Sequence, residues 1–266
     1  MKKVLIFYIS KNSGHYHAAS AIEKGLNEES TDPLEIEKIN GLNYTNPILG
    51  KIINRAYMEV IKNKPEIWEH IYDNPNFLQK TAKARKALHK FNMTKVKKLL
   101  DFHAPDIVFC TQAFPCGMVA DYKRTSGKDF PLVGVLTDYA PHSYWLYDEV
   151  DYYIVPAREI GEVLEEKGIS RNRIKPLGIP VDPKFREKHD AREIKRTLGL
   201  EEGLPTVLIM GGTQGLGSME GVAESLLLDK KHKYQLLVVA GSNEKLYKRL
   251  NKLSEKEGSG HLKVFA

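Results

Sequence analysis

The chain begins with the apolar run VLIFYI (residues 4–9), continues through the turn SKNSG (10–14), and then shows helical spacing from 15 to 29. Apolar residues in that last stretch recur at the intervals that place side chains on one face of a helix. They are Ala18, Ala19, Ile22 and Leu26. A strand, a turn and an amphipathic helix form the first half of a βαβ unit, so this segment predicts a parallel sheet covered by helices.

Short apolar runs and longer helical stretches continue to alternate along the chain. In the first part, strands are predicted at Val4–Ile9, Leu34–Ile39, Asp106–Cys110, Leu132–Leu136, Tyr152–Val155 and Arg173–Pro176. After a polar stretch, further strands are predicted at Thr206–Met210, Gln235–Ala240 and Leu262–Phe265. We therefore expect an α/β protein with a complete domain over residues 1–180 and part of a second over 181–266. A parallel sheet of three strands leaves an apolar edge uncovered, so the second domain is expected to be truncated.

The composition is that of an ordinary globular protein, with 266 residues, 42% hydrophobic and 28% charged. No apolar stretch reaches the ~18 residues that a membrane helix needs. The N-terminus lacks the small-residue cleavage site of a secretory signal. The only cysteines, Cys110 and Cys116, lack metal-ligand spacing. We expect a cytoplasmic protein with two reduced, partly buried thiols.

Positive charge is concentrated between residues 44 and 100. That window contains twelve Lys or Arg and four acidic residues, a net charge of +8, whereas the whole chain carries +6. Within it, an apolar stripe at helical spacing consists of Phe77, Ala84, Leu88 and Phe91. An anionic membrane surface or a solvated helix face would each explain this pattern. Nucleic acid is a weaker explanation, since no known binding motif accompanies the charge.

The turn after the first strand contains a candidate catalytic histidine. Open α/β sheets bind ligands where a strand's carboxyl end meets the next helix. His15 would lie in the first helical turn, where the helix dipole favours a neutral ring that can accept a proton. His17 lies about 200° around the helix, which argues against a shared metal. With one glycine, the turn does not match the dinucleotide fingerprint. A simple capping turn is the alternative interpretation.

A second candidate site is TDYAPHSYW (residues 137–145), which directly follows a predicted strand. Asp138 offers a hydrogen-bond acceptor, His142 a titratable ring and Trp145 an apolar platform. Both this segment and His15 would lie at the carboxyl edge of the sheet. The alternative is a solvent-exposed loop with one aromatic anchor.

The third candidate is the glycine-rich turn MGGTQGLGS (residues 210–218), which again joins a strand to a helix. Its glycines would let the backbone approach a ligand, and a helix N-terminus favours a phosphate or diphosphate. The turn lacks the Gly-Lys-Ser/Thr ending of a P-loop. No acidic residue ends the next strand, which argues against NAD. An ordinary tight turn is the alternative.

Taken in order, several motifs resemble those of one enzyme family. They are SGH (13–15) followed by two alanines, HAPDIV (103–108), TD (137–138) with His142 and Trp145, VDYY (150–153), GIPV (178–181) and MGG (210–212). This arrangement is similar to the monogalactosyldiacylglycerol synthase and processive diacylglycerol glucosyltransferase family of GT-B glycosyltransferases. The first loop keeps only Gly14 before His15, whereas the family usually has Gly-x-Gly-His.

The resemblance implies two Rossmann-like domains and inverting transfer of a hexose from UDP-glucose or UDP-galactose to diacylglycerol. His15 would be the catalytic base. The acceptor lipid would be oriented by Gly14, Asp138, His142 and Trp145. The donor diphosphate would be bound by Gly211, Gly212, Thr213, Gln214 and Gly215. No metal or other cofactor is implied. The basic 44–100 segment would bind anionic lipids, which implies a peripheral protein on the inner face of the cell membrane.

Compared with the family, the chain ends before the segment that carries most donor contacts, so we expect it to be inactive or weakly active alone. One alternative is an enzyme of the same fold, either an undecaprenyl-linked GlcNAc transferase or a UDP-GlcNAc epimerase. Another is a non-catalytic module that binds lipid surfaces. A nicotinamide-dependent oxidoreductase is weaker, because the fingerprint is missing.

Overall fold

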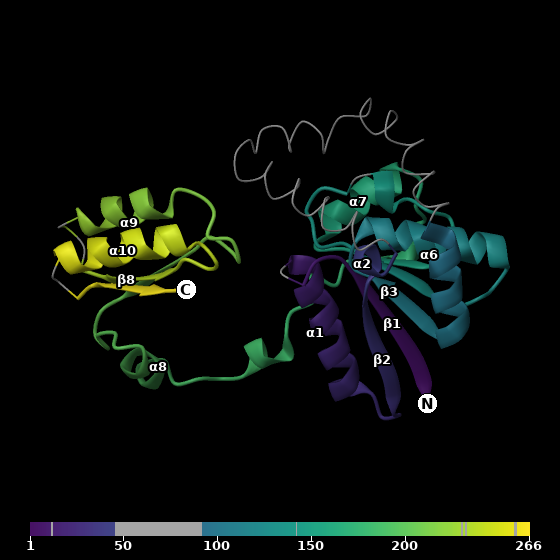
Figure 1. Cartoon of the computed structure of the whole chain (residues 1–266), viewed down its shortest axis with the longest axis horizontal. Coiled ribbons are helices and arrows are strands. Elements are labelled where there is room, and N and C mark those ends of the chain that lie inside the picture. The colour runs from purple at the N-terminus through teal and green to yellow at the C-terminus, as the bar shows by residue number, and fades with distance from the viewer. Residues whose placement is uncertain (12, 46–91, 142, 230, 232, 258–259) are drawn as a thin grey trace. The chain divides into compact units, whose positions relative to one another are not determined.

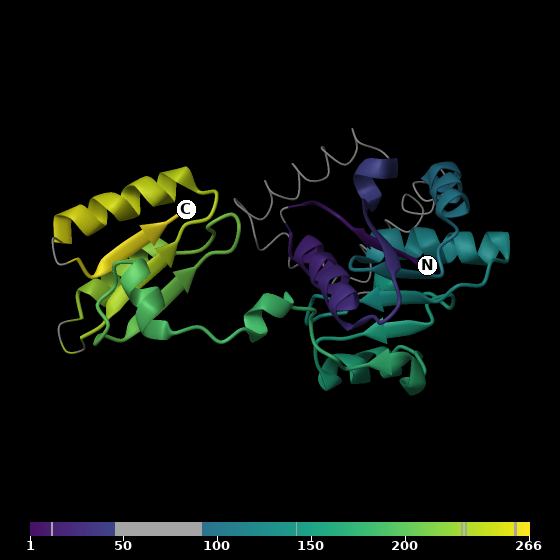
Figure 2. The same cartoon turned by 90° about the horizontal axis from the view of Figure 1, so that it is seen from below.

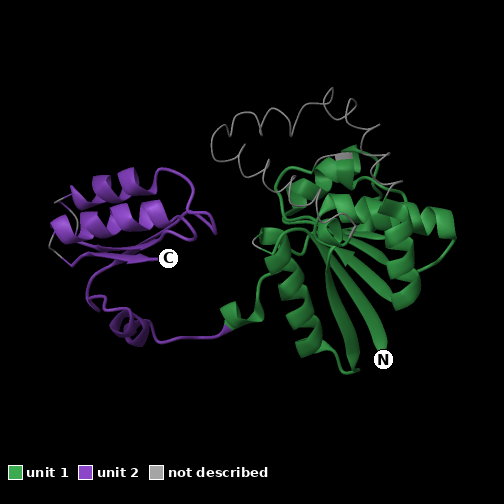
Figure 3. Ribbon diagram, in the orientation of Figure 1, with its two compact units in different colours: residues 1–186 green, residues 187–266 purple. Residues whose placement is uncertain are grey.

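The computed structural model describes the whole chain except residues 12, 46–91, 142, 230, 232 and 258–259. It divides into two compact units, Met1–Arg186 and Glu187–Ala266, coloured separately in Figure 3. Each unit contains its own parallel sheet and its own apolar core.

Unit 1 is built on a six-stranded sheet in which every described pair of neighbouring strands is parallel. The strands are β1 (Lys2–Tyr8), β2 (Leu34–Asn40), β3 (Ile107–Cys110), β4 (Leu132–Val135), β5 (Tyr152–Ile154) and β6 (Ile174–Lys175). Their order in the sheet is β2-β1-β3-β4-β5-β6. The chain therefore adds β2 on one side of β1 and β3 on the other, which makes the β1/β3 boundary the topological switch point.

Helices cover both faces of this sheet, as expected for parallel strands. They are α1 (Gly14–Glu29), the short α2 (Gly41–Thr45), a helix over 92–103, α6 (Ala113–Ser126) and α7 (Arg158–Glu166). On one face Val4, Ile6 and Tyr8 pack with Ala19 of α1, which runs along β1 and β2 (Figures 1 and 2). On the other face Leu5 and Phe7 belong to the main core, which α6 and the 92–103 helix complete.

Unit 2 contains a smaller parallel sheet with the order β7-β8-β9. Its elements are α8 (Ala191–Thr197), β7 (Thr206–Met210), α9 (Met219–Leu227), β8 (Gln235–Val239), α10 (Glu244–Glu257) and β9 (Leu262–Phe265). Both α9 and α10 pack on one face of the sheet (Figure 1). On β7, Leu208 and Met210 alternate with the core-facing residues and are 55% and 63% exposed.

The boundary between the units falls six residues after the expected position at 180. Ion pairs along α1 explain the shift. Lys24 Nζ lies 2.6 Å from the Asp182 carboxylate, and Arg186 donates to Glu28 over 2.9 Å. These pairs bind residues 182–186 to the outer surface of α1, so this stretch belongs to unit 1 although the last strand of that unit ends at Lys175.

Most of the basic 44–100 segment lies outside the described residues, including the whole Phe77–Phe91 stripe. Its described end is the helix over 92–103, in which Val96, Leu99 and Leu100 are buried. The lysines at 95, 97 and 98 are exposed on the same helix. Among the described helices, none is long and apolar enough to cross a membrane.

Candidate functional site

Three neighbouring strands of unit 1 bring candidate residues to the switch point of the sheet. His15 follows β1, Thr111 follows β3 directly, and Thr137 and Asp138 follow β4. In parallel sheets, the carboxyl ends of adjacent strands meet at one edge, and ligands bind at the switch point of that edge. The expectation that His15 and the 137–138 segment share an edge is confirmed by the strand order.

The turn before His15 has a defined backbone shape. Ser10, two residues after β1, adopts a positive φ of 58°, a left-handed backbone conformation that is uncommon for a residue other than glycine. Ser13 is the N-cap of α1: its hydroxyl donates to the carbonyls of Ile9 and Ser10 over 2.7 Å and accepts from the Tyr16 amide. This cap fixes where the helix begins and places His15 in its first turn.

Hydroxyl groups from two other strand ends hold His15. The Thr111 hydroxyl, fully buried, donates to the backbone carbonyl of His15 over 2.9 Å and also lies 3.2 Å from the Phe7 carbonyl. The Thr137 hydroxyl lies 3.0 Å from Nδ1 of the His15 ring. The backbone and the ring of His15 are thus fixed by residues 96 and 122 positions away in the sequence.

Burial lowers the pKa of His15 below its ordinary value, because a charged imidazolium loses solvation there. The nearby Asp138 carboxylate raises that pKa in part, as does a hydrogen bond between the ring and the Thr111 backbone. The ring is therefore neutral at neutral pH, as the sequence predicted. The physical cause differs from the helix dipole that the sequence suggested, because the loss of solvation on burial makes the largest contribution to the lowered pKa.

The expected acceptor residues are found in different surroundings. Gly14 is the exposed first residue of α1, and a Cβ atom built on it would meet nothing within 4 Å. Asp138 is exposed and interacts electrostatically with His15. His142 lies outside the described residues.

Trp145 requires a correction. It is only 1% exposed, and it lies in the main core of unit 1, close to where a Cβ atom on Gly134 would stand (3.5 Å). Its indole is therefore not an exposed platform for a ligand. The alternative of a loop with an aromatic anchor describes this residue better.

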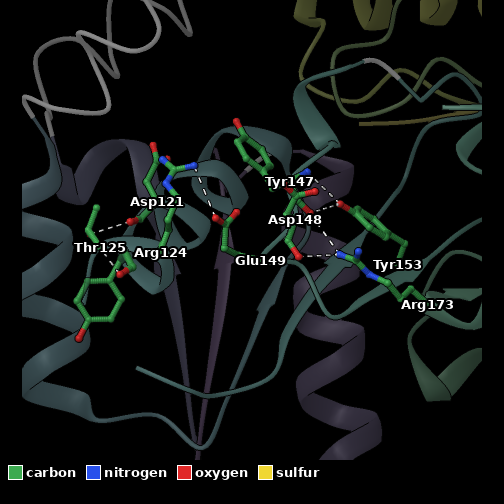
Figure 4. A network of polar contacts seen from close by, with 9 residues as sticks. Asp121, Arg124, Thr125, Tyr147, Asp148, Glu149, Tyr153 and Arg173 are labelled. Atoms are coloured by element: carbon green, nitrogen blue, oxygen red, sulfur yellow. Dashed lines mark hydrogen bonds and ion pairs between the residues drawn. The ribbon is translucent and has the colours of Figure 1, made fainter. Parts of the chain in front are cut away.

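A network of polar groups fixes the loop that follows Trp145 (Figure 4). The buried Tyr153 hydroxyl donates to the Trp145 carbonyl over 2.8 Å and accepts from the Tyr147 amide over 3.2 Å. Arg173 donates to the carbonyls of Tyr147, Asp148 and Val150. The loop after the TDYAPHSYW motif is thereby bound to β5 and to the turn before β6.

In unit 2, the glycine-rich turn packs against the turn between β8 and α10. The Ser242 amide donates to the Thr213 carbonyl over 2.8 Å, and the Asn243 side chain donates to the Gly215 carbonyl over 3.1 Å. Gly215 has φ of +56°, and a Cβ atom there would lie 2.0 Å from the Ala240 carbonyl oxygen. At Gly211, a Cβ atom would lie 2.6 Å from the Leu216 carbonyl oxygen. The sequence predicted these two glycines as ligand contacts, whereas the structure uses both for internal packing.

The remaining predicted residues of this turn are more exposed to solvent. Gly212 and Thr213 are exposed and Gln214 is half-buried. Their backbone amides have no hydrogen-bond acceptor among the described residues. Free amides at the carboxyl edge of a strand, just before α9, are suited to an anionic oxygen.

Two residues that hold the candidate sites in place were not predicted from the sequence, and a third was quoted without a role. Thr111 and Asn243 each follow a strand of their sheet, and this position was the signal that could have found them. Thr137 was part of a quoted motif, but its contact with His15 depends on the strand order.

Cys110 and Cys116 are free thiols and fully buried, not partly buried as expected. Across the described part of the chain, no group of three or more His, Cys, Asp or Glu residues could hold a metal ion.

Comparison with known proteins places this chain among its relatives. Residues 15–181, more than half of the chain, match the family model of monogalactosyldiacylglycerol (MGDG) synthase. This chain belongs to the MGDG synthase family. The matched region begins at His15 and includes Thr111, Thr137 and Asp138.

Relatives of this MGDG synthase family member include a processive diacylglycerol beta-glucosyltransferase of Bacillus pumilus. It is 26% identical over 96% of this chain and 65% of its own length. A probable chloroplastic monogalactosyldiacylglycerol synthase of Nicotiana tabacum is 30% identical over 96% of this chain and 49% of its own length. The chain thus spans about two thirds or less of these two relatives.

Among solved structures, the lipopolysaccharide outer core galactosyltransferase WaaB aligns with all of this chain and 68% of its own chain, with a TM-score of 0.53 and 14% identity. The fold is the GT-B type with Rossmann-like units, as expected.

Proposed function

We propose that this chain forms part of a glycosyltransferase that transfers a hexose from a UDP-sugar to diacylglycerol. Membership of the MGDG synthase family and the names of its relatives support this reaction class. The observation that carries the proposal is His15, whose ring is neutral and held at the switch point of the first sheet.

The proposed chemistry is a direct displacement with inversion. His15 takes the proton from the acceptor hydroxyl, the hydroxyl oxygen forms a bond to the anomeric carbon, and the bond from that carbon to the UDP oxygen breaks. Gly14, Asp138 and His142 orient the acceptor, and Asp138 also stabilises the charged ring that forms. Trp145 contributes by anchoring the loop rather than by touching the lipid.

The departing diphosphate is proposed to bind the glycine-rich turn of unit 2. The free amides of Gly212, Thr213 and Gln214 would donate to its oxygens. Gly211 and Gly215 would give the turn its shape. The reaction is proposed to need no metal or other cofactor, so transfer is expected to persist in a chelator such as EDTA.

The membrane part of the proposal concerns the basic 44–100 segment. Its net charge of +8 would attract anionic lipids at roughly 1 kcal/mol per cation near the surface. Binding there would bring the chain to a membrane that contains the diacylglycerol acceptor. We propose a peripheral association with the inner face of the cell membrane and no role for nucleic acid.

The experiment measures transfer from radiolabelled UDP-glucose and UDP-galactose to diacylglycerol in anionic vesicles. It compares this chain with a version extended to the length of its curated relatives. In the active protein, His15→Ala is expected to lower kcat by about 10²- to 10⁴-fold without unfolding the protein. His17→Ala is the matched control, because His17 is exposed two residues further along the same helix and should have normal turnover.

Near-normal turnover by His15→Ala would overturn the assignment of the base. No transfer by either length, with both proteins folded and bound to vesicles, would favour a non-catalytic lipid-binding module. Transfer to a polyprenyl-linked acceptor, or epimerisation of UDP-GlcNAc, would instead favour the other enzymes of this fold.

A further inference from the structure

We propose that Thr137 is a positioning residue that holds Nδ1 of His15, so that the lone pair of Nε2 is available to the substrate. This inference rests on the proposed role of His15 as the base. It adds a residue to which the comparisons assign no function.

Two threonines hold the backbone and the ring of His15 in place. A histidine base needs both its backbone and its ring plane fixed, since the ring can otherwise rotate about its terminal bond. Thr111 fixes the backbone through the His15 carbonyl at 2.9 Å. Thr137 then contacts the ring itself, with 3.0 Å between its Oγ1 and Nδ1. Together they determine where Nε2 points.

The Thr137 hydroxyl also sets the position of the proton on the His15 ring. A neutral histidine carries one ring proton, and its location is set by the hydrogen bond of the other nitrogen. A threonine hydroxyl can accept a hydrogen bond from Nδ1–H, which leaves Nε2 unprotonated. When Nε2 takes a proton, the Nδ1–H bond to Thr137 persists, so this contact needs no rearrangement during the reaction.

The groups around the His15 ring act on its proton and its charge. Besides Thr137, the described ones are the Thr111 backbone, which accepts a hydrogen bond from a ring N–H, and the Asp138 carboxylate. We assign that N–H to Nδ1, which the Thr111 carbonyl and the Thr137 hydroxyl then share. Asp138 follows Thr137 directly in the sequence. The end of β4 therefore supplies both the group that orients the neutral ring and the charge that stabilises the protonated ring. A valine at 137 would keep the shape and remove only the orienting hydroxyl.

The test reads the tautomer of His15 without using activity. The chain is labelled with ¹⁵N-histidine, and long-range ¹H–¹⁵N NMR spectra are recorded, with His15→Gln to assign the signals. The wild type is expected to show the Nδ1–H tautomer. Thr137→Val should shift His15 toward the other tautomer, whereas Thr137→Ser should match the wild type. Thr125→Val is the matched control, because its hydroxyl bonds to the Asp121 carbonyl within its own helix.

Kinetics on the extended, active protein provide the second measurement. Thr137→Val is expected to lower kcat by about 10- to 100-fold with little change in the KM for the UDP-sugar, because a misdirected base affects the chemical step. Thr137→Ser should restore most of kcat. Melting temperatures of all variants check that they fold.

The proposal is overturned if wild-type His15 carries its proton on Nε2, or if Thr137→Val leaves the tautomer unchanged. It is also overturned if Thr137→Ser loses as much kcat as Thr137→Val. If Thr137→Val changes the tautomer but His15→Ala leaves transfer intact, Thr137 is still the hydrogen-bond partner of the ring. That result would instead overturn the proposed role of His15.

Discussion

At the scale of single residues, His15 shows how surroundings decide the chemistry of a side chain. A histidine in the first turn of a helix is common, and the helix dipole alone changes its protonation modestly. Here burial supplies the larger effect, while Asp138 opposes it. The result is a ring that stays neutral at neutral pH yet lies beside a charge that favours its protonated form.

The first prediction follows from the signs of these two effects. Because burial lowers the pKa of His15, the acid limb of the kcat/KM profile is expected below pH 6.5, the ordinary value for histidine. Asp138→Asn removes a charge that raises this pKa, so it should move the limb to still lower pH. Asp32→Asn, an exposed acid in a turn, is the control. A limb that moves upward in Asp138→Asn would contradict the assignment.

A second prediction concerns the glycines of unit 2. Gly215→Ala places a methyl group against the Ala240 carbonyl at a positive φ. The left-handed backbone costs about 1–2 kcal/mol, and overpacking about 1–3 kcal/mol more. Gly221→Ala is the matched control, since a Cβ atom there meets nothing within 4 Å inside α9, and it should raise stability slightly. Urea unfolding of both variants measures the difference, and equal stabilities would contradict the packing argument.

At the scale of elements, neighbouring tyrosines on β5 have different roles. Tyr153 is buried, and its hydroxyl joins the loop after Trp145 to the sheet (Figure 4). Tyr152 points to the other face and is 45% exposed. The alternation of a strand thus gives one tyrosine to the core and the other to the surface.

The third prediction uses this pair. Tyr153→Phe leaves the Tyr147 amide without its hydroxyl acceptor and is expected to cost about 1–3 kcal/mol in the free energy of unfolding. Tyr152→Phe should change it by less than about 0.5 kcal/mol. Chemical denaturation of the two variants gives the comparison. If Tyr152→Phe cost as much as Tyr153→Phe, the network would not be what stabilises this loop.

At the scale of the whole molecule, the chain folds into two compact units connected by an exposed stretch. Asp182 and Arg186 are ion-paired to α1, whereas residues 187–193 are exposed along their length. Exposed connecting segments with few contacts are the sites that proteases cut first.

The fourth prediction is therefore a tryptic cut between the units, after Lys188, which precedes α8. Mass spectrometry of a short digest should find a fragment that begins in this stretch and extends through unit 2. Lys188→Gln should remove that fragment while leaving other early cuts in place. If no cut occurs between the units before both are degraded, the division at residue 186 would be wrong.

The sequence by itself determined the parallel α/β fold. Each predicted strand is present within a few residues, and β7 and β9 begin and end where expected. These signals are local, because the apolar character of a run and the spacing of a helix face depend only on nearby residues. The same local patterns predicted His15 and Asp138 as candidates, since each follows a strand or its turn.

Only the tertiary structure decided what several residues do. Trp145 occupies the core because its turn packs against α6 and its indole lies beside Gly134 of β4. Gly215 is required because turns from two different strands meet there, at the Ala240 carbonyl. Thr137 reaches His15 because β1, β3 and β4 are neighbours in the sheet although far apart in the chain. Such contacts depend on the order of strands, which the pattern of hydrophobic residues along the chain does not contain.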